Sequence, residues 1–293
     1  MSITTKPGSK IIVDFGIENT GGAVGDGQNI TLTAEDGTKV TVDTLEDFTV
    51  NPGEIQSGVL EWNTAIDQAE QQYQLCVETE NSADCVTAHL TSLPDSTVHR
   101  WTHDESSSTA LTDSVGSQSG VINGATFTTN AKQGSNALTY NGSGDYVDLG
   151  QIPYYSTFTV MGWLNFDTNN SRGTLIDMRS NQGVHIRGEG DGTVELLYYS
   201  GSYDIIAQPT VSTDQWYHFA LAYDGTDAIA FQDGTEIGRM SAGSPQDLGA
   251  AQDALGSKAD LSEQYLDGKT DDVIITNEAL TASQIQDIIN ITT

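Results

Sequence analysis

Short apolar segments separated by turn residues run along the whole chain, and helical periodicity is nearly absent. Segments such as KIIVDFGIEN, TKVTVDTL and CVTAHL alternate between apolar and polar residues or run apolar over a few positions. Between them lie clusters of Gly, Asn and Asp, such as NTGGAVGDGQN, EDGT and NPGE. Alternation is typical of strands that bury one face, and these clusters are typical of the turns between strands. The sequence therefore predicts an all-β chain.

The pattern divides the 293 residues into two predicted domains. Residues 1–95 contain about seven short strand-like segments, and their number and spacing fit an immunoglobulin-like β-sandwich. The segment TSLPDSTVHR at residues 91–100 has the proline and the small polar residues of a linker. Residues 96–293 form a second predicted all-β domain with longer strands.

Two strands and one helix stand out in the second domain. FTVMGWL at residues 158–164 and WYHFALAY at residues 216–223 alternate, so each is expected to place every second side chain on one face of stacked sheets. Near the C-terminal end, LTASQIQDIIN predicts a short helix with Thr281 as its N-cap and an apolar stripe from Ile285 to Ile289.

The order of segments in the second domain resembles the laminin-G-like, concanavalin-A-like jelly roll. The resemblance rests on WTHDES, DSVG, GSNALTYNGSGDYVDLG, FTVMGWL, TLIDMRS, DQWYHFALAYDGT, FQDGTEIG and YLDGKTDDVIITNEALTASQI, which occur in the family's order. It covers essentially all of the second domain. It implies two stacked sheets and, as the usual role of such domains, carbohydrate binding.

The first domain resembles CARDB-type and related immunoglobulin-like adhesion modules of archaeal and bacterial surface proteins. The likeness is carried by Val13, Phe15 and Ile17, then Asn19, Thr20 and Gly21, and further on by Pro52, Gly53 and Glu54. It implies a module that docks or assembles the protein rather than one that performs chemistry.

The charge of the chain is strongly negative. Asp and Glu number 41 and Lys and Arg number 11, so the formal charge is 11 − 41 = −30. Such a surface repels phosphate backbones, so we expect no nucleic-acid binding. Acids spread along the chain with few Lys resemble proteins of haloarchaea and their viruses. At molar salt the Debye length falls to about 3 Å, which makes this self-repulsion tolerable.

No export or membrane segment is visible in the sequence. The N-terminal segment MSITTKPGSKIIVDFG has no charged region followed by a long apolar stretch, so we expect no secretory signal. No apolar run approaches the roughly 20 residues that a membrane-spanning helix needs. We therefore expect no membrane insertion.

Two cysteines, Cys76 and Cys85, flank a predicted hairpin in LCVETENSADCV. One interpretation is a disulfide that clips the two strands together, and the other is a pair of free thiols that pack as small apolar side chains. Without a nearby pair of histidines they cannot form a closed zinc site.

The jelly-roll resemblance implies a structural calcium ion, held by oxygens from the early DSVG turn and the late DDV turn. The matching residues are Asp113 with Gly116, and Asp271 or Asp272. Calcium prefers six to eight oxygen ligands, which turn carbonyls and carboxylates supply. The alternative is chance, because any pair of acids is unremarkable among 41. No other cofactor is expected.

Glycan-binding side chains are expected among tyrosines, because sugar rings stack on flat apolar faces. The candidates are Tyr154 and Tyr155, and the cluster of Tyr198, Tyr199 and Tyr203. Strand alternation places one of Tyr198 and Tyr199 in the core, so at most part of this set is free to bind.

A catalytic pair of carboxylates is the third possibility, because some relatives of this fold are glycoside hydrolases. The local match is Glu189 and Glu195 in EGDGTVE. The glycines of GEGDG predict a hairpin turn, which does not hold two carboxyls at the separation of about 5–5.5 Å that a retaining mechanism requires. We expect a solvated acidic turn and no enzyme.

Together these features are interpreted as a non-enzymatic structural protein on the surface of a haloarchaeal tailed virus. Such a protein is assembled in the host cytoplasm and reaches the exterior without a secretory signal. It would be a capsid decoration, turret or tail-fibre subunit, bound to other virion proteins through the immunoglobulin-like module. The jelly roll would contact host surface glycan or S-layer glycoprotein, and a symmetric homo-oligomer would multiply weak contacts.

Two alternatives remain open. The first is a cellular haloarchaeal surface protein that binds carbohydrate at the cell exterior. The second is a glycoside hydrolase, which predicts sugar release that depends on Glu189 and Glu195.

Overall fold

The computed structural model of the protein forms two compact units, Met1–Ser92 and Leu93–Thr293. The predicted boundary near residue 95 lies close to this division. The structure describes residues 2–5, 10–18, 20, 25–35, 39–63, 72–79, 83–90, 93–168, 171–249 and 252–292. Asn19 and Gly21, which carry part of the adhesion-module resemblance, lie outside these ranges.

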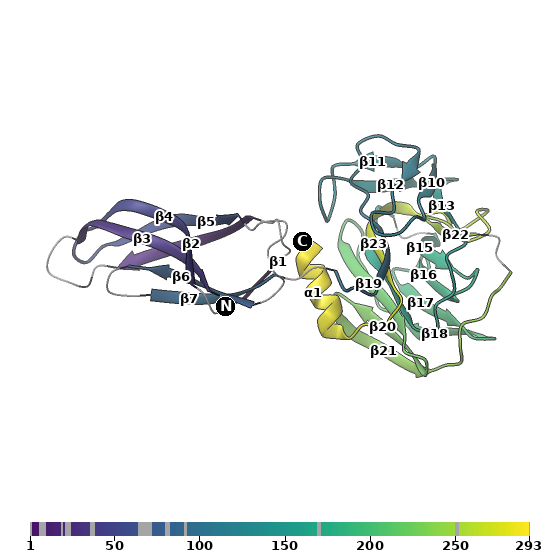
Figure 1. The fold of residues 1–293 in the computed structure, drawn as a ribbon. Helices are drawn as coiled ribbons and strands as arrows, with labels where there is room; N and C mark the ends of the chain where they lie inside the picture. Colours follow the sequence, from purple (N-terminus) through teal and green to yellow (C-terminus); the bar gives the residue numbers. More distant parts are fainter. Residues whose placement is uncertain are drawn as a thin grey trace. The chain divides into compact units, whose positions relative to one another are not determined.

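The first unit is built from β-strands in two sheets (Figure 1). One sheet has the order β1-β7-β6-β3-β4, and the other pairs β2 with β5. The strands are β1 (Ser2–Thr5), β2 (Lys10–Glu18), β3 (Gly25–Glu35), β4 (Lys39–Val50), β5 (Ile55–Asn63), β6 (Gln72–Glu78) and β7 (Ala83–Leu90). A buried cluster that includes Ile30, Leu32 and Leu75 packs against Val13 and Phe15 of β2. The two sheets thus share one apolar core.

Cys76 and Cys85 form a disulfide bond across β6 and β7. The two residues are direct partners in the antiparallel register, and their Cα atoms are 4.1 Å apart. Cys76 is buried and Cys85 is exposed. Of the two interpretations of this pair, the structure shows the disulfide clip.

The second unit contains two larger sheets. The front sheet has the order β18-β17-β16-β15-β22-β13-β10-β9. Its strands are β9 (Ala110–Leu111), β10 (Gly120–Asn123), β13 (Tyr146–Gly150), β15 (Gly173–Met178), β16 (Val184–Gly188), β17 (Val194–Tyr199), β18 (Tyr203–Ala207) and β22 (Asp253–Leu255).

The back sheet has the order β11-β12-β23-β14-β19-β20-β21, and β8 also pairs with β23. Its strands are β8 (Thr97–Trp101), β11 (Thr126–Thr128), β12 (Ala137–Asn141), β14 (Phe158–Phe166), β19 (Trp216–Tyr223), β20 (Asp227–Gln232), β21 (Thr235–Ser241) and β23 (Asp267–Thr276).

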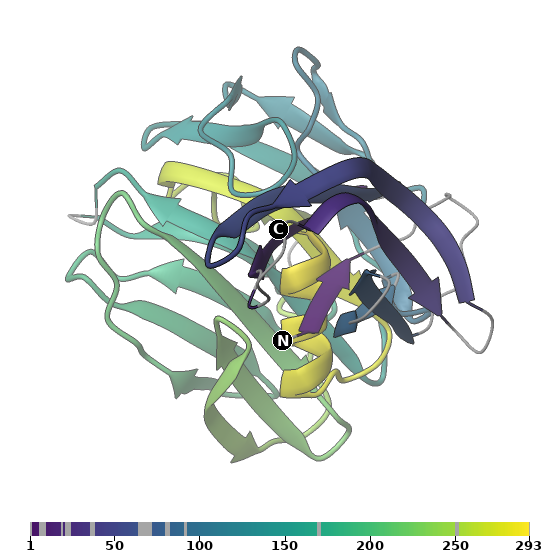
Figure 2. The same cartoon turned by 90° about the vertical axis from the view of Figure 1, so that its left-hand side faces the viewer.

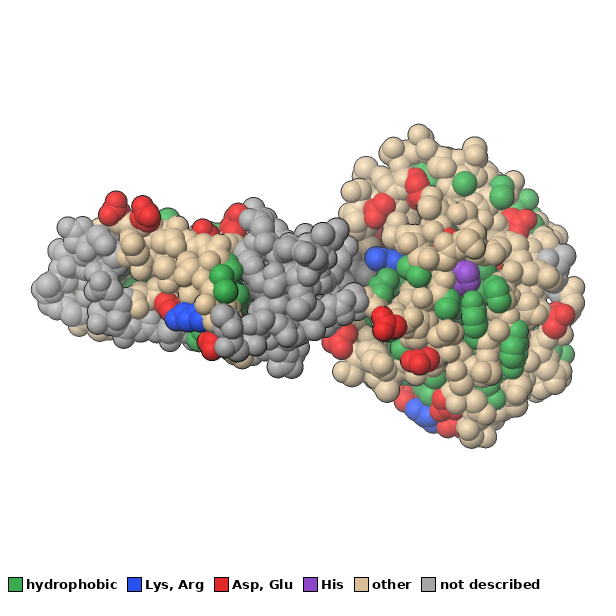
Figure 3. Space-filling view, viewed as in Figure 1, with side chains coloured by type: hydrophobic (Ala, Val, Ile, Leu, Met, Phe, Trp, Pro, Cys, Tyr) green, Lys and Arg blue, Asp and Glu red, His purple; other side chains and the backbone are tan. Residues whose placement is uncertain are grey.

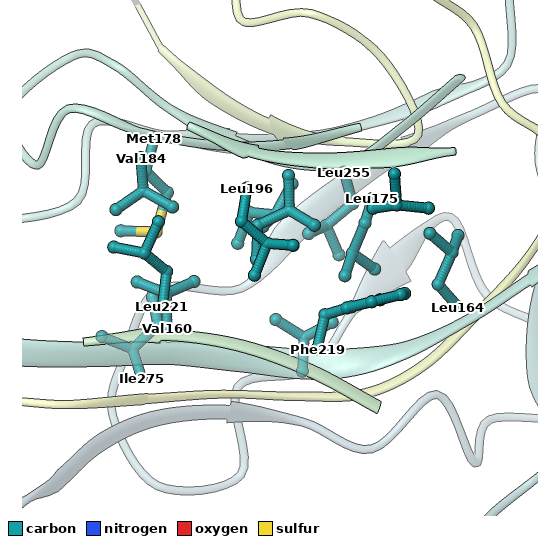
Figure 4. Packing of buried hydrophobic residues seen from close by; sticks show 14 of the residues in the cluster. Val160, Leu164, Leu175, Met178, Val184, Leu196, Phe219, Leu221, Leu255 and Ile275 are labelled. Carbon is teal, nitrogen blue, oxygen red and sulfur yellow. The ribbon is translucent and has the colours of Figure 1, made fainter. Parts of the chain in front are cut away.

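The main core lies between the two sheets (Figure 4). Val160, Phe219 and Leu221 of the back sheet face Val184 and Leu196 of the front sheet. Strand alternation explains this packing, because Val160 points into the core while its neighbour Met161 joins a separate cluster on the opposite face. The prediction of an all-β chain with sandwiched sheets is confirmed.

The helix α1 (Ala282–Thr292) covers the outer face of the back sheet (Figures 1 and 2). It begins with a capping box, because the backbone N–H of Gln284 donates to Thr281 Oγ1 while that of Thr281 donates to Gln284 Oε1. Ile285 and Ile289 are buried together with Met161 of the sheet. The predicted C-terminal helix is confirmed. No helix in the described ranges is long and apolar enough to cross a membrane.

Replacing the exposed Cys85 with serine should destabilise the first unit. The two cysteines are only 9 residues apart. A loop of this size corresponds to a loss of about 2–3 kcal/mol in the free energy of unfolding. Hydrogen exchange followed peptide by peptide should show less protection in β6 and β7, with the second unit as the internal control. Equal protection of β6 and β7 in both proteins would contradict a stabilising role.

Candidate functional site

Four chain segments meet at one end of the second unit. They are residues 151–155, 179–183, 199–203 and 243–248, and hydrogen bonds join them in pairs. The side chains of Asn181 and Gln182 donate to the carbonyls of Ile152 and Pro153. The backbone N–H groups of Gln246 and Leu248 donate to the carbonyls of Tyr199 and Arg179. We call this region the loop end.

The loop end carries an exposed aromatic and apolar surface, which we call the platform and define as Tyr199, Tyr203 and Ile205. Tyr199 of β17 pairs in register with Tyr203 of β18, and their ring centroids are 5.0 Å apart. Tyr203 and Ile205 are 51% and 49% exposed. Figure 3 shows hydrophobic side chains gathered in the middle of one face of this unit, with acidic side chains around them.

Arg179 fixes the position of Tyr203. Its Nη1 donates to the Tyr203 hydroxyl, and its guanidinium carbon lies 5.6 Å from the ring centroid. The same guanidinium is bound on its other edge by both carboxylate oxygens of Asp177. Burial would raise the pKa of Asp177, but the neighbouring His185, the hydrogen-bonded Arg179 and the backbone N–H of Ala259 together outweigh burial, and the pKa is lowered. Tyr203 is therefore held by a buried ion pair.

The outer face of the front sheet next to this ion pair is also polar and buried. His185 of β16 shares a hydrogen bond with Thr174 Oγ1 at 3.1 Å, and the backbone N–H of Ala259 donates to Asp177. Burial lowers the pKa of His185 to about 3, so its ring is neutral at neutral pH. The charge of Arg179 is matched by Asp177 alone in this group.

Asp253 ties two segments of the loop end together. Its carboxylate accepts hydrogen bonds from the backbone N–H of Ile152 and from both the N–H and the hydroxyl of Ser180. Burial raises the pKa of Asp253 to about 6. This carboxylate links the segment that carries Tyr154 to the turn that follows Arg179.

The five predicted tyrosines have different environments. Tyr154 is 50% exposed and lies at the loop end, as do Tyr199 and Tyr203. Tyr155 is directed elsewhere, because its hydroxyl lies 3.3 Å from His99 Nε2. The prediction for Tyr198 is corrected. Its side chain is fully buried, stacks on Tyr223 at 5.2 Å and donates its hydroxyl to the Gly243 carbonyl, so no glycan reaches its face.

Sequence reasoning missed Asp177, Arg179 and Ile205. Asp177 and Arg179 lie two positions apart in TLIDMRS, and this spacing places them on the same side of an extended segment. That signal was present in the sequence. The contact of Arg179 with Tyr203 depends on the pairing of β15, β16, β17 and β18, which the local sequence does not specify.

The carboxylates predicted to bind calcium accept hydrogen bonds from protein groups. The carboxylate of Asp113 accepts hydrogen bonds from five protein groups. Burial would raise the pKa of Asp113, but these hydrogen bonds outweigh burial, and the pKa is lowered. The donors are His99 Nδ1 and the backbone N–H groups of Arg100, Val115, Gly116 and Gln118. Gly116 thus contributes its N–H group to Asp113.

The late pair of aspartates is also bound by protein groups. Asp272 accepts a hydrogen bond from Arg100 Nε at 2.7 Å. Asp271 accepts the backbone N–H groups of Lys132 and Gln133 at one oxygen, and its other oxygen is buried without a hydrogen-bond partner among the described residues. No group of three or more His, Cys, Asp or Glu side chains in the described ranges could hold a metal ion. The predicted ligand set therefore does not fit calcium.

Glu189 and Glu195, the two carboxylates that a glycoside hydrolase would use, both contact the guanidinium group of Arg187. Glu189 lies at the start of a hairpin turn, with its N–H bonded to the Thr193 carbonyl, and Glu195 lies on β17. Arg187 contacts both, with Nε 2.7 Å from Glu189 Oε1 and Nη2 3.0 Å from Glu195 Oε2. Burial and repulsion from Glu189 raise the pKa of Glu195 despite the hydrogen bond from Arg187.

Comparison with known families confirms the jelly-roll prediction for part of the second unit. Residues 141–286 match the Laminin_G_3 family, described as the concanavalin A-like lectin/glucanases superfamily. No curated protein matches the sequence.

Three solved structures illustrate the similarity in fold. Domain 4 of AbnA, an extracellular arabinanase from Geobacillus stearothermophilus, is 19% identical with a TM-score of 0.55, and the match covers 66% of this chain and 98% of that domain. The botulinum neurotoxin serotype D binding domain is 15% identical with a TM-score of 0.52, covering 68% of this chain and 52% of that one. Trypanosoma rangeli sialidase is 11% identical with a TM-score of 0.52, and the match covers 74% of this chain and 42% of that chain. At these identities the matches establish the fold alone.

Asp271 should make the stability of the second unit depend on pH. Burial and repulsion from Asp272 and Asp104 raise its pKa to about 7, although two backbone N–H groups oppose the shift. The folded state therefore holds a proton that the unfolded state releases at lower pH, and stability falls as pH rises from about 4 to about 7.

The variant Asp271→Asn tests this origin of the pH dependence. Its amide oxygen still accepts the two N–H groups, and it carries no charge. We expect the melting temperature of the variant, relative to that of the wild type, to increase as pH rises from about 4 to about 8. A difference between the two proteins that stays constant with pH would show that Asp271 does not titrate in this way.

Proposed function

We propose that the second unit, with its concanavalin A-like lectin/glucanases domain at residues 141–286, binds glycan through the platform. The observation that carries the proposal is the exposed Tyr203 ring, held beside Tyr199 by a buried arginine–aspartate pair. Proteins of similar fold support it: the arabinanase domain was solved in complex with arabinotriose, and a botulinum neurotoxin binding domain in complex with SialylT.

The platform has the physical properties that sugar stacking needs. Sugar rings present flat C–H faces, and half-exposed aromatic side chains bury them with a gain from apolar contact. Because Arg179 already fixes Tyr203, little side-chain freedom is lost on binding. The exposed amide of Gln246, next to Gly201, offers hydrogen-bond partners for sugar hydroxyls beside the rings.

The proposed role is binding rather than catalysis. Arg187 pairs with both Glu189 and Glu195, and Arg172 also pairs with Glu189. A retaining hydrolase needs one carboxylate free to attack the sugar. This arrangement instead supports a structural ion-pair network on the outer face of the front sheet.

The variant Tyr203→Ala should weaken glycan binding by about tenfold, which corresponds to losing about 1.4 kcal/mol of stacking energy. Affinity electrophoresis in gels cast with neutral polysaccharides, including arabinan, measures the effect as lost retardation. Tyr203→Phe keeps the ring but loses the hydroxyl that Arg179 holds, so its binding should lie between that of the wild type and that of Tyr203→Ala. Tyr146→Ala is the control, because β13 lies five strand spacings from β18, or about 24 Å. Equal retardation of Tyr203→Ala and the wild type would exclude the platform.

We further propose that this glycan-binding protein lies on the surface of a haloarchaeal tailed virus. The formal charge of −30 supports a salt-rich setting, and two β-units in series suit a subunit that docks through one unit and displays the other. The first unit, as a CARDB-type module, would bind the capsid or tail. A homo-oligomer would multiply weak glycan contacts.

Mass spectrometry of purified virus particles and of the host envelope fraction tests this assignment. We expect the protein at stoichiometric amounts in intact virions. Recovery solely from the cell envelope would overturn the viral assignment in favour of a cellular carbohydrate-binding protein, and would leave the glycan-binding proposal standing.

A further inference from the structure

The platform extends along β18 as a strip of exposed apolar side chains. Tyr203 and Ile205 are half exposed on one side of the strand, and the intervening Asp204 and the following Ile206 are more buried. Alternate residues on a strand are about 6.6 Å apart. This separation is close to the length of one sugar unit in an extended chain, so the side chains at these two positions can contact neighbouring units.

We propose that the strip binds two consecutive units of a linear neutral glycan, with one unit on Tyr203 and the next on Ile205. This inference rests on the glycan-binding role proposed above. Leu197 of β17, the register partner of Ile205, lies beside the second position on the neighbouring strand, as Tyr199 lies beside the first.

The form of the strip favours an internal stretch of glycan over a terminal sugar. Tyr203 and Ile205 each keep about half of their surface exposed, at 51% and 49%, so the chain is not enclosed at either position.

The charges around the strip favour a neutral glycan. Arg179 is the cation that contacts the platform, and both oxygens of Asp177 already bind it. A carboxylate on the glycan would therefore meet an arginine whose charge is already matched.

Oligosaccharides of increasing length test the two-unit site. The probes are the mono-, di-, tri- and tetrasaccharides cut from the neutral polysaccharide that retards the protein most, measured by isothermal titration calorimetry on the full chain. We expect at least tenfold tighter binding of the disaccharide than of the monosaccharide, and little gain beyond it.

The variant Ile205→Ala separates the two positions. It should lower the affinity for the disaccharide to near that for the monosaccharide and leave the monosaccharide affinity unchanged, whereas Tyr203→Ala should weaken both. Val121→Ala is the matched control, because Val121 is also an exposed residue of the front sheet, at 56%, on the distant strand β10. Unfolding midpoints of all variants verify that the fold is retained.

The outcomes distinguish this inference from the proposed function. Equal affinity for mono- and disaccharide, or an Ile205→Ala variant that behaves as the wild type, would overturn the two-unit site while glycan binding stands. Tighter binding of a uronic-acid oligosaccharide of the same length would overturn the neutral class. No retardation by any polysaccharide would overturn the proposed function, and the inference with it.

Discussion

Each sheet of the second unit has two faces, and the apolar core between the sheets occupies only one face of each. The second face of the back sheet is covered by α1, whose isoleucines form a further apolar cluster. The outer face of the front sheet instead carries buried polar groups beside a partly exposed apolar strip. This difference in covering leaves part of the front sheet open to solvent, and the proposed glycan site lies on that part.

Burial of charge on the front sheet requires partners, and these partners make the loop end rigid. An unpaired charge away from water is strongly disfavoured. Arg179 is therefore bound by Asp177, His185 stays neutral, and Asp253 accepts three hydrogen bonds from two chain segments. Each contact that satisfies a buried group also fixes a loop. The exposed ring of Tyr203 is positioned by groups that are themselves hidden from solvent.

The sequence predicted the elements of the fold better than the contacts between them. Period-two alternation and the Thr281 cap are local signals, so the strands and α1 could be predicted from them. Alternation also limited Tyr198 and Tyr199 to one exposed member, but which ring faces the core depends on the register of β17 in the sheet. The carboxylate of Asp113 looked free for a metal because its five donors come from the folding of neighbouring turns and β8. Both the orientation of Tyr198 and the occupancy of Asp113 therefore depend on contacts between segments that are distant in the sequence.

The charge of the chain and the chemistry of the platform are compatible for a physical reason. At molar salt, attraction between exposed charges is screened within about 3 Å, whereas apolar contact is not weakened by such screening. A site that relied on exposed ion pairs with its ligand would lose affinity under these conditions. The platform relies on ring and aliphatic surface, and its ion pair is buried behind Tyr203. The excess of 41 acids over 11 bases can therefore keep the surface hydrated without governing the proposed recognition at β18.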